Sequence, residues 1–209
     1  LEFGGTLLIT DTAVTFAGAE FNGLVTLGDS AANTVLNGTV VGNGNTITGQ
    51  AVTISGAAVS GLTFDKAVTV ANSASTLSGI TFNANLTLGI GTALQNTISF
   101  SADATLDVNA ASSVDTLSLA SGVALTIDGS AQLSGNTGAS IVAASGNATV
   151  NLGSSANVTG VDLGANVSFD SINDGASFAN AVVAEEVTLE SNATFDSVVF
   201  SKAAIISGV

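Results

Sequence analysis

The amino-acid sequence predicts an all-β protein: a parallel β-helix (β-solenoid) of about ten coils, each about 19 residues long. Three observations support this fold class. One pattern of residues is repeated along the chain, two independent series of positions recur with the same period, and apolar residues alternate with polar ones in short runs. We expect residues 1–209 to form a single β-solenoid domain, either a mature product or a segment of a longer or polymerising protein.

The repeat is clearest between residues 51 and 82. Residues 51–64 read AVTISGAAVSGLTF, and residues 67–82 read AVTVANSASTLSGITF. Each copy predicts an alternating strand, a loose connector of small residues, an apolar residue, a Ser-Gly corner and a second short strand. We interpret each copy as one coil, in which the strand faces the solvent through Thr53 or Thr69 and the core through the flanking Val and Ile side chains.

Two series of positions give the period. The first is the apolar residue before each polar corner: Phe21, Leu36, Val59, Leu77, Leu94, Val114, Leu133, Val158, Phe178 and Phe195. The second is the outward residue of the alternating strand: Thr53, Thr69, Thr87, Asp107, Thr126, Asn151, Ser168 and Thr188. Both series advance by about 19 residues per step. Because no helical periodicity accompanies them, the coils are predicted to consist of strands.

The corners favour a solenoid over hairpins. Asn22–Gly23 and Asn37–Gly38 resemble hairpin turns, but Thr159–Gly160 and Asp196–Ser197 fill the same slot elsewhere. A corner that accepts such varied pairs indicates an arc between two stacked sheets. Inside the coils we expect one column of large residues, beginning as an aromatic ladder: Phe64, Phe82, Phe100, then Leu119, Leu163, Val183 and Phe200.

Two regions depart from the period. Residues Ser134–Ala148 contain the surplus of one long step and are predicted to form a bulging loop, whereas Leu1–Asn45 is predicted to form an imperfect first pair of coils. No segment has the pattern of an amphipathic capping helix. We therefore expect open strand edges at the ends, covered by caps outside this chain or by other copies of it.

The stretch VVGNGNTITG (Val40–Gly49) resembles the phrasing G-N-x-x-T-I-x-G of right-handed parallel β-helices. With its period and its Ala/Val/Thr/Gly/Asn/Ser coils, the chain is similar to secreted β-helical adhesins of the filamentous-haemagglutinin and autotransporter-passenger type. The resemblance implies an extracellular or cell-surface rod, and it transfers no functional residue.

Composition excludes several function classes. The net charge is -14 and Lys66 and Lys202 are the only basic side chains, so nucleic acids and anionic membrane surfaces are not expected as partners. No apolar run reaches the ~18 residues of a spanning helix, so membrane insertion is not expected either. Cys and His are absent, as are Tyr and Arg, which removes most nucleophiles and general bases. We predict that the protein is not an enzyme and has no cofactor.

Four further hypotheses concern polar side chains. Paired carboxylates for glycoside hydrolysis would have to come from scattered acids: Asp107, Asp115, Asp128 and Asp162. Calcium could bind Glu185, Glu186 and Glu190, or Asp170 and Asp174. The outward Thr column, which also includes Thr15 upstream, could bind ice, but Asp107, Asn151 and Ser168 interrupt it. Glycans could attach to the sequon asparagines: Asn37, Asn85, Asn147, Asn157, Asn166 and Asn192.

For each of these hypotheses we favour a simpler interpretation. The acids are interpreted as solubilising charges and the threonines as ordinary solvent-facing strand residues. The sequence therefore predicts no catalytic, cofactor or metal site. It favours a structural rod of a filament, fibre or adhesin stalk that associates with copies of itself. The alternatives are an adhesin passenger that binds cell-surface glycans or receptors through loops, and a polysaccharide-active enzyme.

Overall fold

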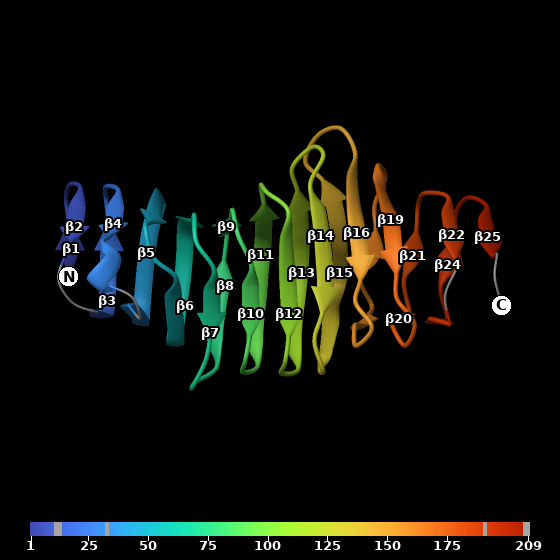
Figure 1. Cartoon of the computed structure of the whole chain (residues 1–209), viewed down its shortest axis with the longest axis horizontal. Coiled ribbons are helices and arrows are strands. Elements are labelled where there is room, and N and C mark those ends of the chain that lie inside the picture. Colours follow the sequence, from blue (N-terminus) through green and yellow to red (C-terminus); the bar gives the residue numbers. More distant parts are fainter. Residues whose placement is uncertain (11–13, 32–33, 190–191, 207–209) are drawn as a thin grey trace.

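The computed structural model describes residues 1–10, 14–31, 34–189 and 192–206. The chain forms an elongated rod with its two ends at opposite tips (Figure 1). Short strands make up most of it, and all of their pairings are parallel. The one helical element in these ranges is a 3₁₀ turn, η1 (Asp29–Ala31). The predicted parallel β-solenoid is confirmed.

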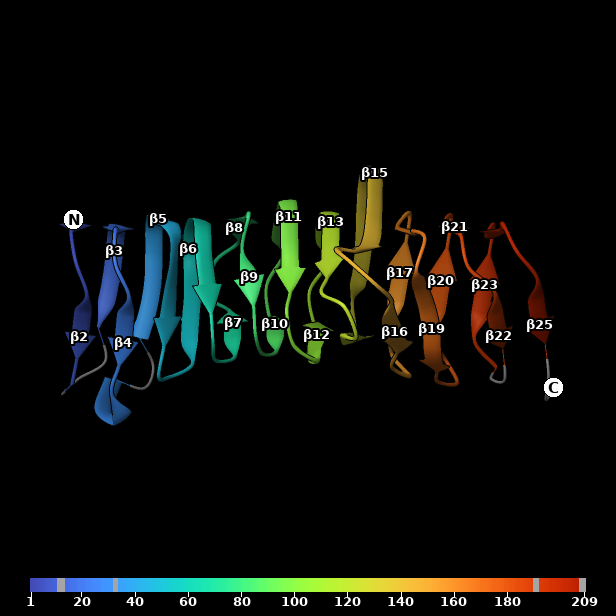
Figure 2. The ribbon, with the colours of Figure 1, turned by 90° about the horizontal axis from the view of Figure 1, so that it is seen from above.

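One coil contains three strand segments, which we call sides A, B and C. They are separate strands in the coil that begins at Val68, namely β7 (Val68–Val70) on side A, β8 (Ser75–Ser78) on side B and β9 (Thr81–Phe82) on side C. Each segment pairs with the equivalent segment of the next coil. The strands of successive coils therefore stack along the rod (Figure 2).

The remaining strands repeat this order. Side A also contains β10 (Leu86–Leu88), β12 (Ala104–Val108), β14 (Ala124–Asp128), β16 (Ala148–Leu152), β19 (Val167–Ile172), β22 (Val187–Leu189) and β25 (Ala204–Ile206). Side B contains β1 (Glu2–Phe3), β17 (Asn157–Thr159), β20 (Ser177–Ala179) and β23 (Thr194–Asp196). Side C contains β2 (Leu7–Ile9), β4 (Val25–Leu27), β18 (Asp162–Leu163), β21 (Val182–Val183) and β24 (Val199–Phe200). Longer strands continue from one side to the next: β3 (Thr15–Phe21), β5 (Thr34–Thr48), β6 (Val52–Phe64), β11 (Thr92–Phe100), β13 (Ser112–Leu119) and β15 (Gln132–Ala143).

The core is a thin apolar column inside the coils. Val52 and Ile54 are buried whereas Thr53 between them is partly exposed, as the alternation predicts. The aromatic ladder is confirmed, because Phe64, Phe82 and Phe100 are buried with 5.7 Å between successive ring centroids. Burial of each such side chain stabilises the fold by about 1.5–3 kcal/mol.

The backbone conformation of the corner between sides B and C explains why several residue types occur there. One corner residue usually has a positive φ angle: Gly61, Gly79, Asn96, Gly160, Asn180 and Ser197. Gly, Asn and occasionally other small polar residues tolerate this left-handed backbone. Since the strands on both sides of the corner pair in parallel with the next coil, the corner is an arc, as predicted, and not a hairpin turn.

The register corrects the predicted series near the N-terminus. Leu36 pairs with Phe16 and Ile54, so it belongs to side A and not to the column before the corner. That column instead continues upstream from Val59 to Val40. Phe21 pairs with Phe3 and does not pair with Leu36. The error arose because strands β3 and β5 run across a corner, and apolar residues occur on both sides of it.

The predicted bulging loop at Ser134–Ala148 is mostly strand. Residues up to Ala143 lie in β15, which rises above its neighbours in Figure 2. The surplus enters this strand at a bulge, because Val114 pairs with Gly135 whereas Thr116 pairs with Ser140. Only residues 144–147 form a connection to β16. Alternation in this segment is weak, which is why it looked like a loop.

Two other predicted columns are also displaced by two residues at β15. Leu133 pairs with Ser112, two residues before Val114. On side C, Leu119 pairs with Ala143. Leu163 pairs with Ile141, so its column is displaced by two residues from the column of Leu119. Val183 and Phe200 continue that displaced column as predicted.

The residues predicted as one outward series on side A lie in different columns of the structure. Thr53, Thr69, Thr87 and Asp107 follow one another as predicted, but Asp107 then pairs with Asp128. Thr126 belongs to a neighbouring column that runs from Thr105 to Asn151 and Ser171, and Ser168 pairs with Thr149. Thr188 pairs with Ile205 through the backbone, and its side chain is outside the described part of the structure. The outward threonines therefore form no single array along the rod.

Candidate functional site

One hollow in the described surface is a shallow groove across four coils of side B. Small residues line it: Ala74, Ser75, Thr76, Gly91, Thr92, Ala93, Ala111, Ser112, Ser113 and Ser134. Ser75, Thr92 and Ser112 are buried at its floor. The groove offers small methyl and hydroxyl groups and no ionisable side chain.

The hydroxyls on the groove floor are already used. The Ser75 hydroxyl accepts the Ala57 N–H and donates to the Ser73 carbonyl, both at 3.2 Å. The Ser112 hydroxyl accepts the Thr92 N–H at 3.2 Å. These side chains connect the turn before side B to the adjacent coil, so they are structural and not free to act on a ligand. The sequence does not reveal these three residues, because inward Ser and Thr have the same pattern as outward ones.

Two of the four candidate acids, Asp162 and Asp128, accept a backbone N–H from the next coil, whereas Asp107 bonds within its own coil. Asp162 Oδ1 accepts the N–H of Val182 at 2.7 Å, and Asp128 Oδ1 accepts the N–H of Ser155 at 3.2 Å. Asp107 accepts a bond from the side chain of Asn109 at 2.7 Å. The register places Asp107 beside Asp128 on side A, and it separates both from Asp162 on side C. These acids therefore do not converge as a group of four.

The fourth acid, Asp115, lies in a polar ladder along the B–C corner. Its Oδ2 accepts the Asn96 N–H at 2.7 Å, and its Oδ1 accepts the Asn136 side-chain amide at 2.6 Å. Asn96 in turn donates to the Ser78 hydroxyl at 2.7 Å. The Asn136 hydrogen bond, followed by the Asn96 N–H, lowers the pKa of Asp115. Four successive coils are linked by this ladder.

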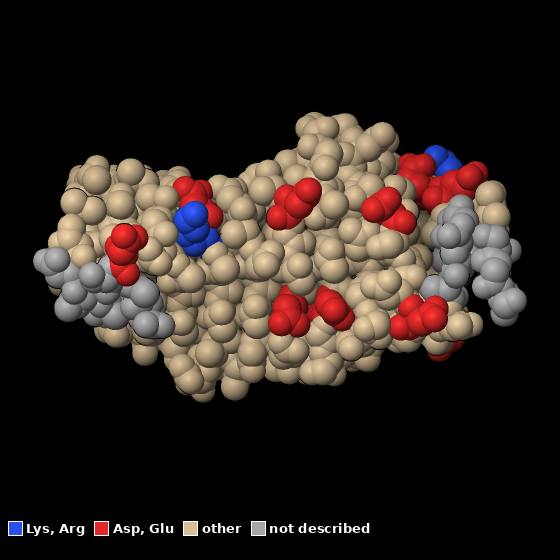
Figure 3. Space-filling model, viewed as in Figure 1, with Lys and Arg blue, Asp and Glu red and all other residues tan. Residues whose placement is uncertain are grey.

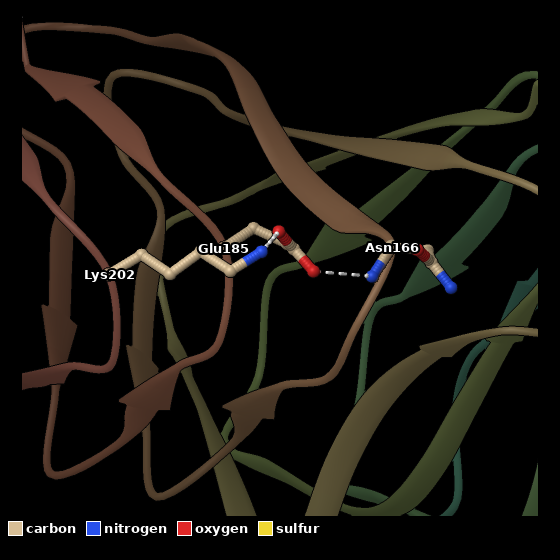
Figure 4. A network of polar contacts seen from close by, with 3 residues as sticks. All are labelled: Asn166, Glu185 and Lys202. Atoms are coloured by element: carbon tan, nitrogen blue, oxygen red, sulfur yellow. Dashed lines mark hydrogen bonds and ion pairs between the residues drawn. The ribbon is translucent and has the colours of Figure 1, made fainter.

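The first calcium candidate surrounds Glu185 (Figure 4). Its Oε1 accepts the Asn166 backbone N–H at 3.0 Å, and its Oε2 forms an ion pair with Lys202. The Lys202 hydrogen bond, followed by the Asn166 N–H, lowers the pKa of Glu185. Both carboxylate oxygens have partners, and these partners lie in the coils on either side, so Glu185 links three coils. A hollow beside it is lined by Asn147, Asn166, Ser168, Glu185 and Glu186.

The other calcium ligands do not complete a site in the described residues. Glu190 lies outside them. Asp174 accepts the N–H of Asn192 at 2.8 Å, and Asp170 lies on an exposed part of β19. Across the described ranges, no three acidic side chains come together as a metal site would require.

All six sequon asparagines are exposed: Asn37, Asn85, Asn147, Asn157, Asn166 and Asn192. Asn85 also accepts the N–H of Thr105 at 2.8 Å, so its side chain has a structural partner. Glycan attachment stays a hypothesis that exposure permits.

Charge is spread thinly over the surface. Figure 3 shows separate small acidic groups on one face, and the basic groups on this face lie next to acidic ones. Among the described residues, no helix has the length and hydrophobicity needed to span a membrane.

No protein-family model, curated protein or solved structure matches the chain. The function therefore has to be argued from the rod itself. In that rod, most of the polar side chains described above connect one coil to the next, and this is their common property.

Proposed function

We propose that this chain is a structural rod of an extracellular filament, fibre or adhesin stalk. Its role is mechanical: it holds attached parts at a fixed distance and resists unfolding. We place it with secreted β-helical proteins of the filamentous-haemagglutinin and autotransporter-passenger type, whose coil style its sequence resembles. Copies of the same protein, or further coils, are its proposed partners.

The observation that carries this proposal is the use of side chains for contact between coils. Backbone ladders join the strands from β1 to β24 except β22, which pairs with β25. Polar side chains add to these ladders, as in the links from Asp115 to Asn96 and from Asp162 to Val182. A protein built to bind or transform a ligand would hold some polar groups free in a concave site, whereas these groups are directed along the rod.

The first and last described coils support the self-association part of the proposal. Leu1 is 81% exposed and Leu8 62% exposed in the first coil, whereas Val199 is 61% exposed near the other end. Uncovered parallel strands at such ends can pair with another strand. Leu7 donates its N–H to Leu24 of the second coil, so the alternation of a parallel ladder directs the N–H of Leu8 to the open side.

Two substitutions at Leu8 distinguish backbone pairing at the strand edge from non-specific hydrophobic association. Leu8→Pro removes the outward N–H, whereas Leu8→Thr keeps it and removes only the exposed apolar side chain. We expect the unmodified protein to form end-to-end particles in electron microscopy and in sedimentation velocity. Leu8→Pro should reduce their length and number, and Leu8→Thr should retain most of them.

The control is Lys66→Gln, a change on a turn away from both ends of the rod. A proline placed inside the rod, for example Gln95→Pro, would not serve, because Gln95 pairs with the adjacent coil. Lys66→Gln should leave assembly unchanged. Strictly monomeric particles of the unmodified protein at high concentration would contradict self-association. If both Leu8 variants lose end-to-end particles equally, the association is hydrophobic aggregation and not edge pairing.

A second candidate function rests on the bulge in β15. Residues 136–138 are exposed, and three more residues occur here than in the paired strand of the preceding coil. Loops and insertions on a rigid scaffold commonly carry binding contacts. We infer that an adhesin passenger would use this bulge to contact a receptor or a glycan.

Deletion of residues 137–139 tests this second function. It would place Asn136 opposite Asp115 and Ser140 opposite Thr116, and so would preserve the register of both flanking pairs. Binding to cells or glycan arrays should disappear while circular dichroism stays that of the intact rod. Unchanged binding by a correctly folded deletion variant would reject the bulge as the contact site.

A further inference from the structure

The N-terminal coils contain all three Asn-Gly dipeptides of the chain, at Asn22, Asn37 and Asn43. Asparagine before glycine is chemically labile because glycine lacks the side chain that hinders attack by its own amide nitrogen. In that reaction the Gly nitrogen bonds to the Asn Cγ and ammonia leaves, which produces a cyclic imide. Water then opens the imide to aspartate or to isoaspartate, in which the main chain continues through the side-chain carbon.

The three dipeptides differ in how tightly their main chain is held. Gly23 lies directly on the backbone of Gly5, where an added Cβ would come within 2.5 Å of the Gly5 carbonyl carbon. Asn37 pairs with Ala17 in one neighbouring coil, and Gly38 pairs with Ala57 in the other. The main chain at these two sites is therefore held and cannot turn to close the ring without local unfolding.

Asn43 and Gly44 are outside the ladders on both sides. The pairing of β5 with β6 jumps from Val41 to Asn45, and the pairing of β3 with β5 ends at Val41. Both residues are exposed, and a Cβ on Gly44 would meet nothing within 4 Å. Their φ angles are 47° and 80°, as expected for a bulge that protrudes from the strand. This main chain has the freedom that ring closure requires.

The Asn43 side chain connects the first coils. Its amide nitrogen donates to Glu20 Oε1 at 2.9 Å and to Asn22 Oδ1 at 2.7 Å. Asn22 continues the series with a bond to Glu2 Oε1 at 3.2 Å. Exposed hydrogen bonds of this kind slow the reaction by roughly two- to tenfold each, so they delay ring closure without preventing it.

We propose that Asn43 is a site of spontaneous deamidation and that its conversion loosens the first two coils. The product replaces an amide donor with a carboxylate, which faces the carboxylate of Glu20 and leaves the Asn22 oxygen without its donor. An isoaspartate also lengthens the main chain inside β5. Because β3 and β4 pair with β5, both strands lose support on this side.

The rates are tested by peptide mapping and mass spectrometry after incubation at mildly alkaline pH. In protein denatured with urea, the three Asn-Gly sites should convert at similar rates. In folded protein, Asn43 should convert at least about tenfold faster than Asn22 and Asn37, which need local opening. Equal conversion at the three folded sites, or faster conversion at Asn22 or Asn37, would overturn the assignment.

The structural consequence is tested with matched variants. Asn43→Asp imitates one product, and Asn43→Gln keeps an amide donor while strongly slowing ring closure. Hydrogen exchange over residues 15–27 should be several-fold faster in Asn43→Asp than in Asn43→Gln, with residues 92–128 unchanged in both. Equal exchange in the two variants would show that the modification leaves the coil stack intact, and this part of the proposal would fail. These measurements do not depend on whether the rod self-associates.

Discussion

The carboxylate of Asp115 accepts the backbone N–H of Asn96 at a distance of 2.7 Å, although 19 positions separate the two residues. Asn96 has a φ angle of 55°, so its N–H lies at a corner where the regular ladder is interrupted. The aspartate of the next coil supplies the missing acceptor. An acidic side chain thus completes the contact between coils at the place where the backbone does not.

Asp115 should make the stability of the rod depend on pH. Hydrogen bonds lower its folded pKa, so its contribution is present above the ordinary value of 3.8 and is lost as the pH falls through the lower folded pKa. Asp115→Asn should unfold at lower denaturant concentration at neutral pH, because its amide presents a donor to Asn96 or Asn136. It should also lose less stability on acidification. Denaturation curves from neutral pH to about pH 2 would measure both effects.

Asp103→Asn is the matched control, because Asp103 accepts a single backbone bond, from Ala124 at 2.8 Å. Its effect should be smaller at neutral pH. If Asp115→Asn and the unmodified protein lose the same stability on acidification, the ladder at Asp115 does not contribute as described.

Phe82 is the middle ring of the aromatic ladder and should be sensitive to truncation. Phe82→Ala leaves a cavity between Phe64 and Phe100 and should lower the unfolding free energy by about 3–5 kcal/mol. Phe82→Leu should cost less because it fills part of the space. The adjacent Thr81→Ala, on the outer side of the same strand, should change stability by less than about 0.5 kcal/mol. Chemical denaturation followed by circular dichroism measures all three.

Gly135 marks a close approach of two backbones. A Cβ at this position would come within 1.9 Å of the Gly160 carbonyl oxygen, so Gly135→Ala should destabilise the rod by about 1–3 kcal/mol. Gly5→Ala is the control, because a Cβ there meets nothing within 4 Å. Thermal unfolding of the two variants should differ clearly. Similar midpoints would mean that the coils separate easily at the β15 bulge.

The Glu185 cluster allows its two partners to be separated. Lys202→Gln removes the largest cause of the lowered pKa of Glu185, so that pKa should rise toward the ordinary 4.5. It should remain below that value because the Asn166 N–H is retained. Lys66→Gln, at the other basic residue, should leave it unchanged. A carboxyl-detected NMR titration measures this, and a full return to 4.5 in Lys202→Gln would show that the Asn166 N–H does not outweigh desolvation, which raises this pKa.

The fold was predictable because its signal is repeated. Alternation around Thr53 and Thr69, and the recurrence of Phe64 and Phe82, specify strands that stack, and each coil reinforces the next. The register was harder, because a displacement of two residues preserves the alternation. At β15 the displacement moved Leu133 to Ser112, although both positions still point inward. A period therefore identifies the fold, but it does not resolve shifts of two.

The polar contacts could be predicted only in part. Acids at outward or corner positions were visible in the sequence, and the structure places Asp115 and Asp162 there. Their partners were not visible, because each bond depends on which residue of the adjacent coil lies opposite. Asn96 becomes a partner of Asp115 through the irregular register of β11 with β13, and Asn136 becomes one through the bulge of β15 against β13. No sequence signal distinguished these asparagines from others in the corners.

The coils differ in length, and this has a consequence for assembly of the chain. The step from Val52 to Val68 is 16 residues, whereas the step from Leu133 to Val158 is 25. With identical steps, a strand could slip by one whole coil and find an equivalent partner. Here a slipped strand would meet a coil of the wrong circumference, and its inward residues would lose their positions. Unequal steps therefore penalise misfolded forms in which the rod is shortened by one coil.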